Sequence, residues 1–134
     1  MIIQTNHAPA AIGPYSQAIL ANDVLYTSGQ VALSPANGAV VGQDIRTQAE
    51  TACNNLGAIL SAAGMDFEDV VKTTCFLSDM ADFSAFNEVY ASYFVSSPAR
   101  SCVAVKELPK GVLCEIEAIA VKNNKEKEEA TTNA

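Results

Sequence analysis

The sequence predicts a single α+β domain in which a mixed β-sheet is covered by helices on one of its two faces. The first observation is length, since 134 residues leave room for one hydrophobic core and not for two. The second is composition, because 49% hydrophobic and 17% charged residues are typical of a globular chain and argue against disorder. The third is the order of the segments, which runs strands, helix, strand, helix, two strands.

The chain begins with two predicted strands, residues 15–20 and 24–33, which are joined near residues 21–23. The second segment is rich in β-branched residues and alternates two sets of side chains, as a half-buried strand does. Residues 34–38 (Ser-Pro-Ala-Asn-Gly) have the composition of a turn, so the second strand is expected to end before them.

An amphipathic helix is predicted to start at Asp44 or Thr47 and to stop at Gly64. Its apolar residues recur at steps of three and four, which is the stripe of a helix that packs on a core. Thr47 and Glu50 have the spacing of a capping box, and Gly64 tolerates the left-handed conformation that ends many helices. The stripe comprises Ile45, Ala49, Ala52, Cys53, Leu56, Ile59, Leu60 and Ala63.

A third strand and a second helix follow. Residues 70–77 are β-branched and predict a strand, and residues 78–82 supply candidate N-caps for the helix. The helix is expected to end before Pro98, because the residue before a proline is disfavoured in the α conformation. One face of this helix presents four aromatic side chains, Phe83, Phe86, Tyr90 and Phe94.

The last two predicted strands are residues 99–106 and 112–121, and a polar tail at 122–134 is expected to fray. In residues 99–106, valine side chains point to one face while Cys102 and Ala104 point to the other, so both faces are largely apolar. Helices can cover only one of these faces. The sequence therefore predicts that a partner subunit covers the other, in a homo-oligomer.

Charge and cysteine usage exclude several classes of function. Fifteen acidic residues against eight basic ones give a net charge of −7, without the basic stripe that a nucleic acid or an anionic membrane surface would need. The four cysteines form no CxxC pair and lie far in sequence from His7, so no metal site is expected. We expect reduced thiols and a cytoplasmic protein without a secretory signal. Nucleotide-binding motifs are absent from the sequence, so no bound nucleotide is expected.

Arg100 is the most unusual residue of the predicted strands. Strand alternation places it on the same face as Cys102, and we expect this to be the face that needs a partner subunit. A buried guanidinium must bind an anion, and a carboxylate is its best geometric match. A substrate carboxylate and an internal ion pair with Glu115 or Glu117 both satisfy this requirement.

Two carboxylates, Glu115 and Glu117, share one face of the last predicted strand with apolar residues. This placement suits an ion pair, or a raised pKa and a role in proton transfer, but it also suits solvated charges on an edge strand. Cys102 could be a nucleophile, yet no histidine lies near it in sequence to act as its base, which favours a small core residue.

Three further residues have two interpretations each. Tyr15 and Ser28 fit either core packing or the wall of a site. Asn87 lies one position away from the aromatic stripe of the second helix and could cap the helix or face solvent. The residues by themselves thus indicate an oligomeric α+β domain with a candidate anion site.

Four motifs in a fixed order resemble the Rid family, which is the YjgF group of reactive-intermediate deaminases, over about residues 1–121. The resemblance implies a chorismate-mutase-like α+β fold, with a mixed six-stranded sheet and two helices on one face, assembled as a homotrimer with sites in the clefts between subunits. It also implies one deaminase domain over residues 1–121. The motifs are Ala10-Ala11-Ile12-Gly13-Pro14-Tyr15-Ser16-Gln17-Ala18, Thr27-Ser28-Gly29-Gln30, Pro98-Ala99-Arg100-Ser101-Cys102-Val103 and Glu115-Ile116-Glu117-Ala118-Ile119-Ala120.

The resemblance implies hydrolysis of 2-iminobutanoate and 2-iminopropanoate, or their enamine tautomers, to 2-keto acids and ammonia without a cofactor. Arg100 resembles the residue that binds the substrate carboxylate, and Glu115 resembles the carboxylate that orients the attacking water. The remaining lining residues implied by the resemblance are Cys102 and Gly29, through their backbone groups, and Tyr15, Ser28 and Asn87. A trimer that binds 2-keto acids without turnover, for example as a regulator, and a ribonuclease or translation inhibitor are the alternative functions.

The sequence departs from the family pattern at residues 95–97 (Val-Ser-Ser), where it is several residues shorter than typical members. It also lacks the usual aromatic residue before Pro98. This segment precedes Arg100, so the departure bears on which imine side chains are accepted.

Overall fold

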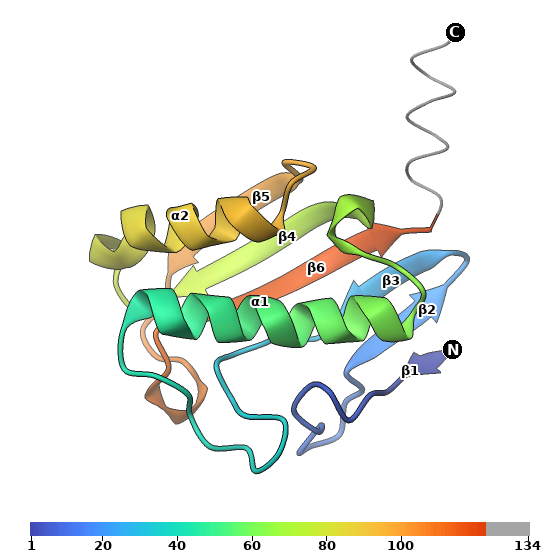
Figure 1. Ribbon diagram of the computed structural model, residues 1–134, viewed down its shortest axis with the longest axis horizontal. Helices are drawn as coiled ribbons and strands as arrows, with labels where there is room; N and C mark the ends of the chain where they lie inside the picture. Colours follow the sequence, from blue (N-terminus) through green and yellow to red (C-terminus); the bar gives the residue numbers. More distant parts are fainter. Residues whose placement is uncertain (123–134) are drawn as a thin grey trace, which may run out of the picture.

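The computed structural model describes residues 1–122, and it contains one six-stranded sheet with two α-helices packed on the same face (Figure 1). The strand order is β1-β2-β3-β6-β4-β5, and every neighbouring pair is antiparallel except the parallel pair β4–β5. This arrangement confirms the predicted α+β class. The strands are β1 (Ile2–Ile3), β2 (Ala18–Ala21), β3 (Val24–Thr27), β4 (Val70–Leu77), β5 (Ala99–Ala104) and β6 (Cys114–Val121), and the helices are α1 (Ile45–Ala62) and α2 (Phe83–Tyr93).

Three short 3-10 turns, Phe67–Asp69, Met80–Asp82 and Pro109–Gly111, complete the described elements. The predicted tail, residues 122–134, lies outside the described residues except for Lys122. Within residues 1–122, neither helix combines the length and the hydropathy that crossing a membrane requires.

The first predicted strands are shorter in the structure than in the sequence prediction. Residues 15–17 precede β2, and β3 ends at Thr27 instead of continuing to residue 33. The early end of β3 is explained by α1, where the buried Asn55 side-chain amide donates hydrogen bonds to the carbonyls of Val31 (3.0 Å) and Leu33 (2.9 Å). These carbonyls are satisfied without a neighbouring strand, and only isolated bridges at Gln30 and Leu33 remain.

Helix α1 begins directly after Asp44, the first of the two predicted starts, but the predicted capping box at Thr47 is wrong. The N-cap is Asp44, whose carboxylate accepts a hydrogen bond from the Thr47 backbone N–H at 3.1 Å. Thr47 therefore lies inside the first turn. The expected stop is confirmed, since Gly64 follows the helix with a φ of 74°.

The remaining elements match the sequence predictions closely. Strand β4 has its predicted bounds, whereas β5 stops two residues early and β6 starts two residues late. Strand β1 was not predicted, because two residues are too few to establish a periodicity. It is held at the sheet edge by pairing with Ile19 and Ala18 of β2.

The core lies between the helices and one face of the sheet. Leu56, Ile59 and Leu60 of α1 and Phe86 of α2 are completely buried there. Strand β6 alternates strictly, with even-numbered residues buried under the helices and odd-numbered residues, including Glu115 and Glu117, half-buried on the opposite face.

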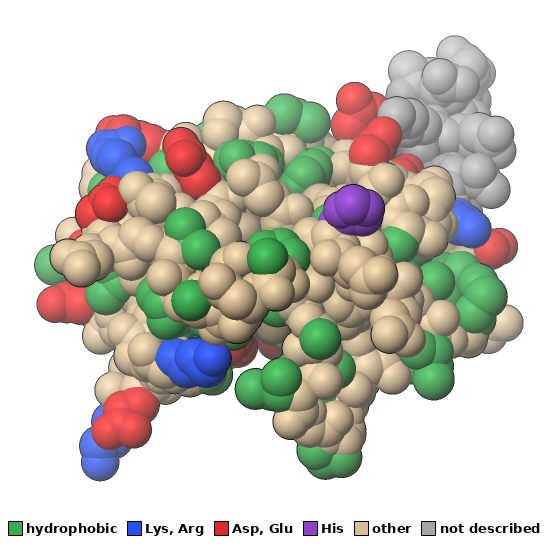
Figure 2. Space-filling model, turned by 60° about the horizontal axis from the view of Figure 1, so that its bottom comes forward, with side chains coloured by type: hydrophobic (Ala, Val, Ile, Leu, Met, Phe, Trp, Pro, Cys, Tyr) green, Lys and Arg blue, Asp and Glu red, His purple; other side chains and the backbone are tan. Residues whose placement is uncertain are grey.

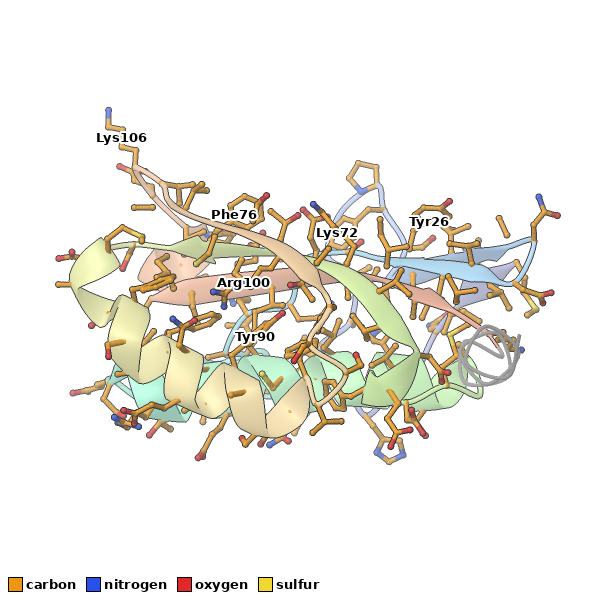
Figure 3. All side chains as sticks on the ribbon, turned by 90° about the horizontal axis from the view of Figure 1, so that it is seen from above. Tyr26, Lys72, Phe76, Tyr90, Arg100 and Lys106 are labelled. Carbon is orange, nitrogen blue, oxygen red and sulfur yellow. The ribbon has the colours of Figure 1, made fainter. Side chains whose placement is uncertain are left out.

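The face of the sheet that points away from the helices is called the open face below. Tyr26, Lys72 and Phe76 project from it, whereas Tyr90 and Arg100 lie between the sheet and α2 (Figure 3). Apolar side chains remain exposed on the open face, since Ile19, Tyr26 and Val103 are 39%, 49% and 46% exposed. The sequence predicts that one apolar face of the sheet is left for a partner subunit, and in the structure the uncovered face is this one.

Candidate functional site

Arg100 lies on the edge strand β5 and extends under α2. Its Nη1 donates a hydrogen bond of 2.7 Å to Oδ1 of Asn87. Its guanidinium carbon lies 4.8 Å from the centre of the Tyr90 ring and 5.5 Å from that of Phe83. The three surrounding residues occur at positions i, i+4 and i+7 of one helix, so a single face of α2 encloses the guanidinium.

The interpretation of Arg100 as half of an internal ion pair with Glu115 or Glu117 is wrong. Arg100 is level with Thr73 of β4, which is level with Ala118 of β6, and these three side chains share the helix-covered face. The two glutamates alternate to the open face. Among residues 1–122 the only ion pair is Arg46–Glu88, at 2.6 Å between exposed side chains, so the charge of Arg100 has no acidic partner there.

The predicted relation of Arg100 to Cys102 is confirmed, because both side chains lie on one face and both are half-buried. The expectation that this is the uncovered face is wrong, since α2 packs above it. Alternation along a strand separates two faces, but it does not say which of them receives the helices.

A pocket of about 360 Å³ opens beside Arg100. Its other walls come from α2 and from the segment that leads into β5, and they are Asn87, Tyr90, Ala91, Phe94, Val95, Ser97 and Pro98. Val95 and Ser97 of the segment between α2 and β5 thus form part of the pocket. Ser97 has a φ of 51°, a conformation that favours glycine, and this turn brings Pro98 back towards β5.

Cys102 is unsuited to nucleophilic chemistry in this setting. Burial raises the pKa of its thiol, and the nearby Arg100 charge only partly offsets this. The thiol is therefore protonated at neutral pH. All four cysteines are free, and burial also raises the pKa of Cys75 and of Cys114 to about 12.

Glu115 lies on the open face, directly against Gly29. A Cβ placed on Gly29 would lie 2.5 Å from Oε2 and 2.9 Å from Cγ of Glu115, so only glycine leaves room for this carboxylate. Burial, and then repulsion by Glu117, raise the pKa of Glu115. No hydrogen bond to the Glu115 carboxylate occurs within residues 1–122, which leaves its oxygens available to an external donor.

The other predicted wall residues, Ser28 and Tyr15, lie near Gly29. Ser28 donates a hydrogen bond of 2.6 Å to the Ser16 carbonyl, which fixes the start of the loop that carries Gly29. Tyr15 is 51% exposed and lines, together with Gly29, a pocket of about 330 Å³. Its hydroxyl accepts a long hydrogen bond of 3.5 Å from the Ile12 N–H.

Gln17 is a residue whose role sequence reasoning missed. Its buried side chain accepts a hydrogen bond from the Thr5 N–H and donates to the carbonyls of Thr5 and Pro9, at 2.8–3.1 Å. These bonds fix the N-terminal loop beside Tyr15. The signal was present, since a glutamine directly before a strand of small and apolar residues is an unusual buried group.

The predicted site residues therefore fall into two groups, on opposite faces of one sheet. The Arg100 half-site comprises Asn87, Arg100 and Cys102, and the Glu115 half-site comprises Tyr15, Ser28, Gly29 and Glu115. Strand β4 separates β5 from β6, so the backbone of the sheet stands between Arg100 and Glu115. Arg100 and Glu115 of the same chain therefore point to opposite sides of the sheet. Residues 1–122 contain no cluster of side chains suited to holding a metal ion.

Comparison with known proteins places this chain in one family. The family model described as endoribonuclease L-PSP matches residues 5–122. A RutC family protein of Synechocystis sp. is 53% identical over 123 residues, which cover 90% of this chain and 95% of that protein. The 2-iminobutanoate/2-iminopropanoate deaminase of Capra hircus is 54% identical over 121 residues, covering 90% of this chain and 88% of that protein.

A solved structure agrees with the fold described above. The crystal structure of E. coli TdcF with bound serine has a TM-score of 0.87 to this chain at 43% identity, covering 92% of this chain and 99% of that one. The sequence motifs, the six-stranded sheet with its two helices and these matches lead to one assignment: the chain belongs to the endoribonuclease L-PSP family, the Rid or YjgF family that the motifs resemble.

Proposed function

We propose that this protein is a 2-imino acid deaminase, which hydrolyses 2-iminobutanoate and 2-iminopropanoate to 2-keto acids and ammonia. The observation that supports it most is Arg100, a guanidinium held by a neutral amide and two aromatic rings without an acidic partner. Such a cation lacks the anion that its partial burial demands. A 2-imino acid supplies that anion as its carboxylate, and the deaminase relatives act on such compounds.

The proposed chemistry needs only water and the two half-sites. The substrate carboxylate binds Arg100 through charge-assisted hydrogen bonds, which contribute roughly 1.5–3 kcal/mol. Glu115 takes a proton from water while the oxygen of that water attacks C2 of the imine. That proton passes to the imine nitrogen, which gives a neutral carbinolamine. Glu115 then takes the hydroxyl proton of the carbinolamine and returns it to the nitrogen as the C–N bond breaks, so that the C2 carbonyl of the 2-keto acid forms and ammonia leaves. A raised pKa of Glu115 brings this base closer to neutrality, where it both takes and returns a proton efficiently.

We infer that the chain assembles as a homotrimer with its sites in the clefts between subunits. The Arg100 half-site of one subunit would face the Glu115 half-site of its neighbour. The exposed apolar side chains of the open face support such packing. Gly29 and Cys102 would contribute their backbone groups, and Tyr15, Ser28 and Asn87 would form the walls.

We place the deaminase domain at residues 1–121, with no cofactor, nucleic acid or membrane as a partner. A cytoplasmic location is supported by four unpaired cysteines, which persist as thiols in a reducing compartment. The substrates would then be small 2-imino acids formed in the same compartment.

The test uses imines generated in situ by an amino-acid oxidase, with keto-acid formation followed in the presence and absence of the purified protein. Arg100→Ala should reduce the catalysed rate at least a hundredfold while the oligomer persists in size-exclusion chromatography. Arg46→Ala is the matched control, since Arg46 forms only an exposed pair with Glu88 and its loss should leave the rate unchanged. Equal rates for wild type and Arg100→Ala would refute the assignment.

A second candidate is a trimer that binds 2-keto acids or amino acids without turnover. The TdcF structure with bound serine favours it, since that relative holds a small amino acid. Binding of 2-ketobutanoate in calorimetry, together with no acceleration in the imine assay, would establish this function instead of hydrolysis.

The name of the family model suggests a third function, ribonuclease activity. The net charge of −7 argues against it, and on the face drawn in Figure 2 the basic side chains are few and separated. RNA cleavage that persists in Arg100→Ala but disappears on stricter purification would identify a contaminant.

A further inference from the structure

The Arg100 guanidinium is held by residues whose own positions are fixed from the core. Tyr90, which lies 4.8 Å from it, is 8% exposed, and its hydroxyl forms a hydrogen bond of 2.7 Å with the Thr73 hydroxyl. Thr73 is completely buried at the middle of β4 and is level with Arg100 in the parallel β4–β5 pair. The residue on the strand and the residue on the helix therefore meet directly beside the arginine.

The ring of Tyr90 is also constrained from its other sides. It stacks on Phe94 with ring centres 4.3 Å apart and an interplanar angle of 21°, and it contacts Phe86 at 5.9 Å. The stacking on Phe94 restrains rotation of the ring about its Cβ–Cγ bond, and the hydrogen bond to Thr73 holds the far end of the ring, so that the side chain cannot swing away without breaking a buried hydrogen bond. It thus forms a rigid surface on which the guanidinium can stack.

We propose that Tyr90, anchored by Thr73, is a positioning residue that sets the orientation of Arg100 for the substrate carboxylate. Asn87 binds one edge of the planar guanidinium, and the Tyr90 ring fixes the plane itself. The remaining N–H groups then point in a defined direction, which a bidentate carboxylate requires. Because Asn87, Tyr90 and Phe83 are neutral, they hold the cation without competing for the substrate as an acidic partner would.

The inference rests on the proposed function, since it deepens the role of Arg100 in that reaction. It predicts an effect on substrate binding more than on the chemical step, because water and its base belong to the Glu115 half-site. A residue that only stabilised the fold would lower the melting temperature without a selective change in KM.

The experiment compares variants that remove the hydroxyl pair or the ring. Thr73→Val and Tyr90→Phe should each raise KM for 2-iminobutanoate about three- to tenfold with little change in kcat, because each removes the hydrogen bond that anchors the ring beside Arg100. Thr73→Ser keeps the hydroxyl and should restore a KM near that of the wild type. Tyr90→Leu removes the ring and should raise KM about two- to thirtyfold, the range expected for loss of a cation–π contact.

A double variant separates positioning from simple damage. Thr73→Val combined with Tyr90→Phe removes both hydroxyls, so no buried polar group is left unpaired, but the ring still lacks its anchor. Its KM should stay as high as that of each single variant, whereas a return to the wild-type KM would show that an unpaired hydroxyl, and not loss of the anchor, caused the single-variant effects and would overturn the inference. Tyr93→Leu is the matched control, since Tyr93 lies on the same helix but its ring contacts Phe67 instead of Arg100. Its KM should equal that of the wild type.

The inhibition constant of 2-ketobutanoate should rise by the same factor as KM in each variant, because the product shares the substrate carboxylate. Unchanged KM and inhibition constants in both Thr73→Val and Tyr90→Leu would overturn the inference while leaving the deaminase assignment intact. If the wild type hydrolyses no imine, the proposed function fails instead. In that case the positioning role is tested by the dissociation constant of 2-ketobutanoate, measured by calorimetry. A higher constant in Tyr90→Leu than in the wild type supports the role, and equal constants overturn it.

Discussion

The Glu115 side chain lies against the Cα of Gly29, so closely that a methyl group at this position would be 2.7 Å from its carboxyl carbon. The glycine is needed here for space, since it follows β3 where the chain runs beside β6 and the next residue, Gln30, pairs with Ile116. The position of the proposed base therefore depends on a residue that itself carries no reactive group.

Gly29→Ala should displace the Glu115 carboxylate and lower kcat by about tenfold or more. Complete loss of a general base lowers the rate by about a hundredfold or more, and a displaced base should lose part of that contribution. The fold should persist, because Gly29 is exposed. Single-turnover and steady-state rates in the imine assay measure the effect. Gly57→Ala is a suitable control, since its new methyl group would meet only the Phe67 ring, at 3.0 Å. A Gly29→Ala protein with wild-type kcat would contradict the proposed role of Glu115.

The activity should fall as the pH drops through the pKa of Glu115, which burial and the neighbouring Glu117 raise above the ordinary value. Glu117→Gln removes the repulsion and should move the acid limb of the kcat profile to lower pH. A profile of kcat against pH for both proteins measures this shift. An acid limb that stays in place would show that Glu117 does not act on the titrating group.

The same raised pKa predicts that the ionised Glu115 lowers the free energy of unfolding, whereas an ionised carboxylate in a salt bridge raises it. The native state binds the proton of Glu115 more tightly than the unfolded chain does, so this residue destabilises the fold once the pH exceeds its unfolded pKa. Glu115→Gln should therefore melt at a higher temperature than wild type at neutral pH. Thermal melts across pH check this, and the difference should vanish below about pH 4, where both states are protonated.

Two inactive variants should restore activity when they are mixed. An Arg100→Ala subunit keeps its Glu115 half-site, and a Glu115→Gln subunit keeps its Arg100 half-site. After unfolding and refolding together in equal amounts, about a quarter of the clefts in a homotrimer would combine the two intact halves. The recovered rate should approach that fraction of the wild-type value. No recovery in verified mixed oligomers would mean that both residues act from one subunit or that one of them does not act.

Asp44→Ala should reduce stability without affecting the chemistry. Its carboxylate caps α1 through the Thr47 N–H, and loss of such a cap costs about 1 kcal/mol. Urea denaturation should show a lower midpoint with an unchanged slope. Asp44→Ser retains a cap and should recover most of the lost stability, and imine hydrolysis should be unchanged in both variants.

Much of the fold follows from periodicity, and the failures have specific causes. The α1 stripe and the β-branched run of β4 predicted those elements because their packing repeats along the chain. The segment 28–33 has a strand-like composition but is held by Asn55, which lies more than twenty residues away. A contact at that separation leaves no local signal.

The site was only partly predictable for a similar reason. The motifs singled out Arg100 and Glu115, and alternation placed Arg100 beside Cys102. Which face each residue occupies depends on the register across β5, β4 and β6, and this register relates positions that are far apart in sequence. The Thr73–Tyr90 pair escapes prediction because the two residues lie 17 positions apart and meet only where α2 packs on the sheet.

Strand β6 places apolar side chains on its helix-covered face and carboxylates on its open face, and this alternation restricts insertions and deletions within the strand. A deletion of one residue within it would exchange the two sides of all positions beyond the deletion. Carboxylates such as Glu117 would then point into the hydrophobic core beneath α1. Ala118 and Ala120, which are buried in that core, would point to the open face instead. Among natural variants of this chain, insertions and deletions inside β6 should therefore be much rarer than those in the loop that precedes it, because selection removes variants that lose the fold.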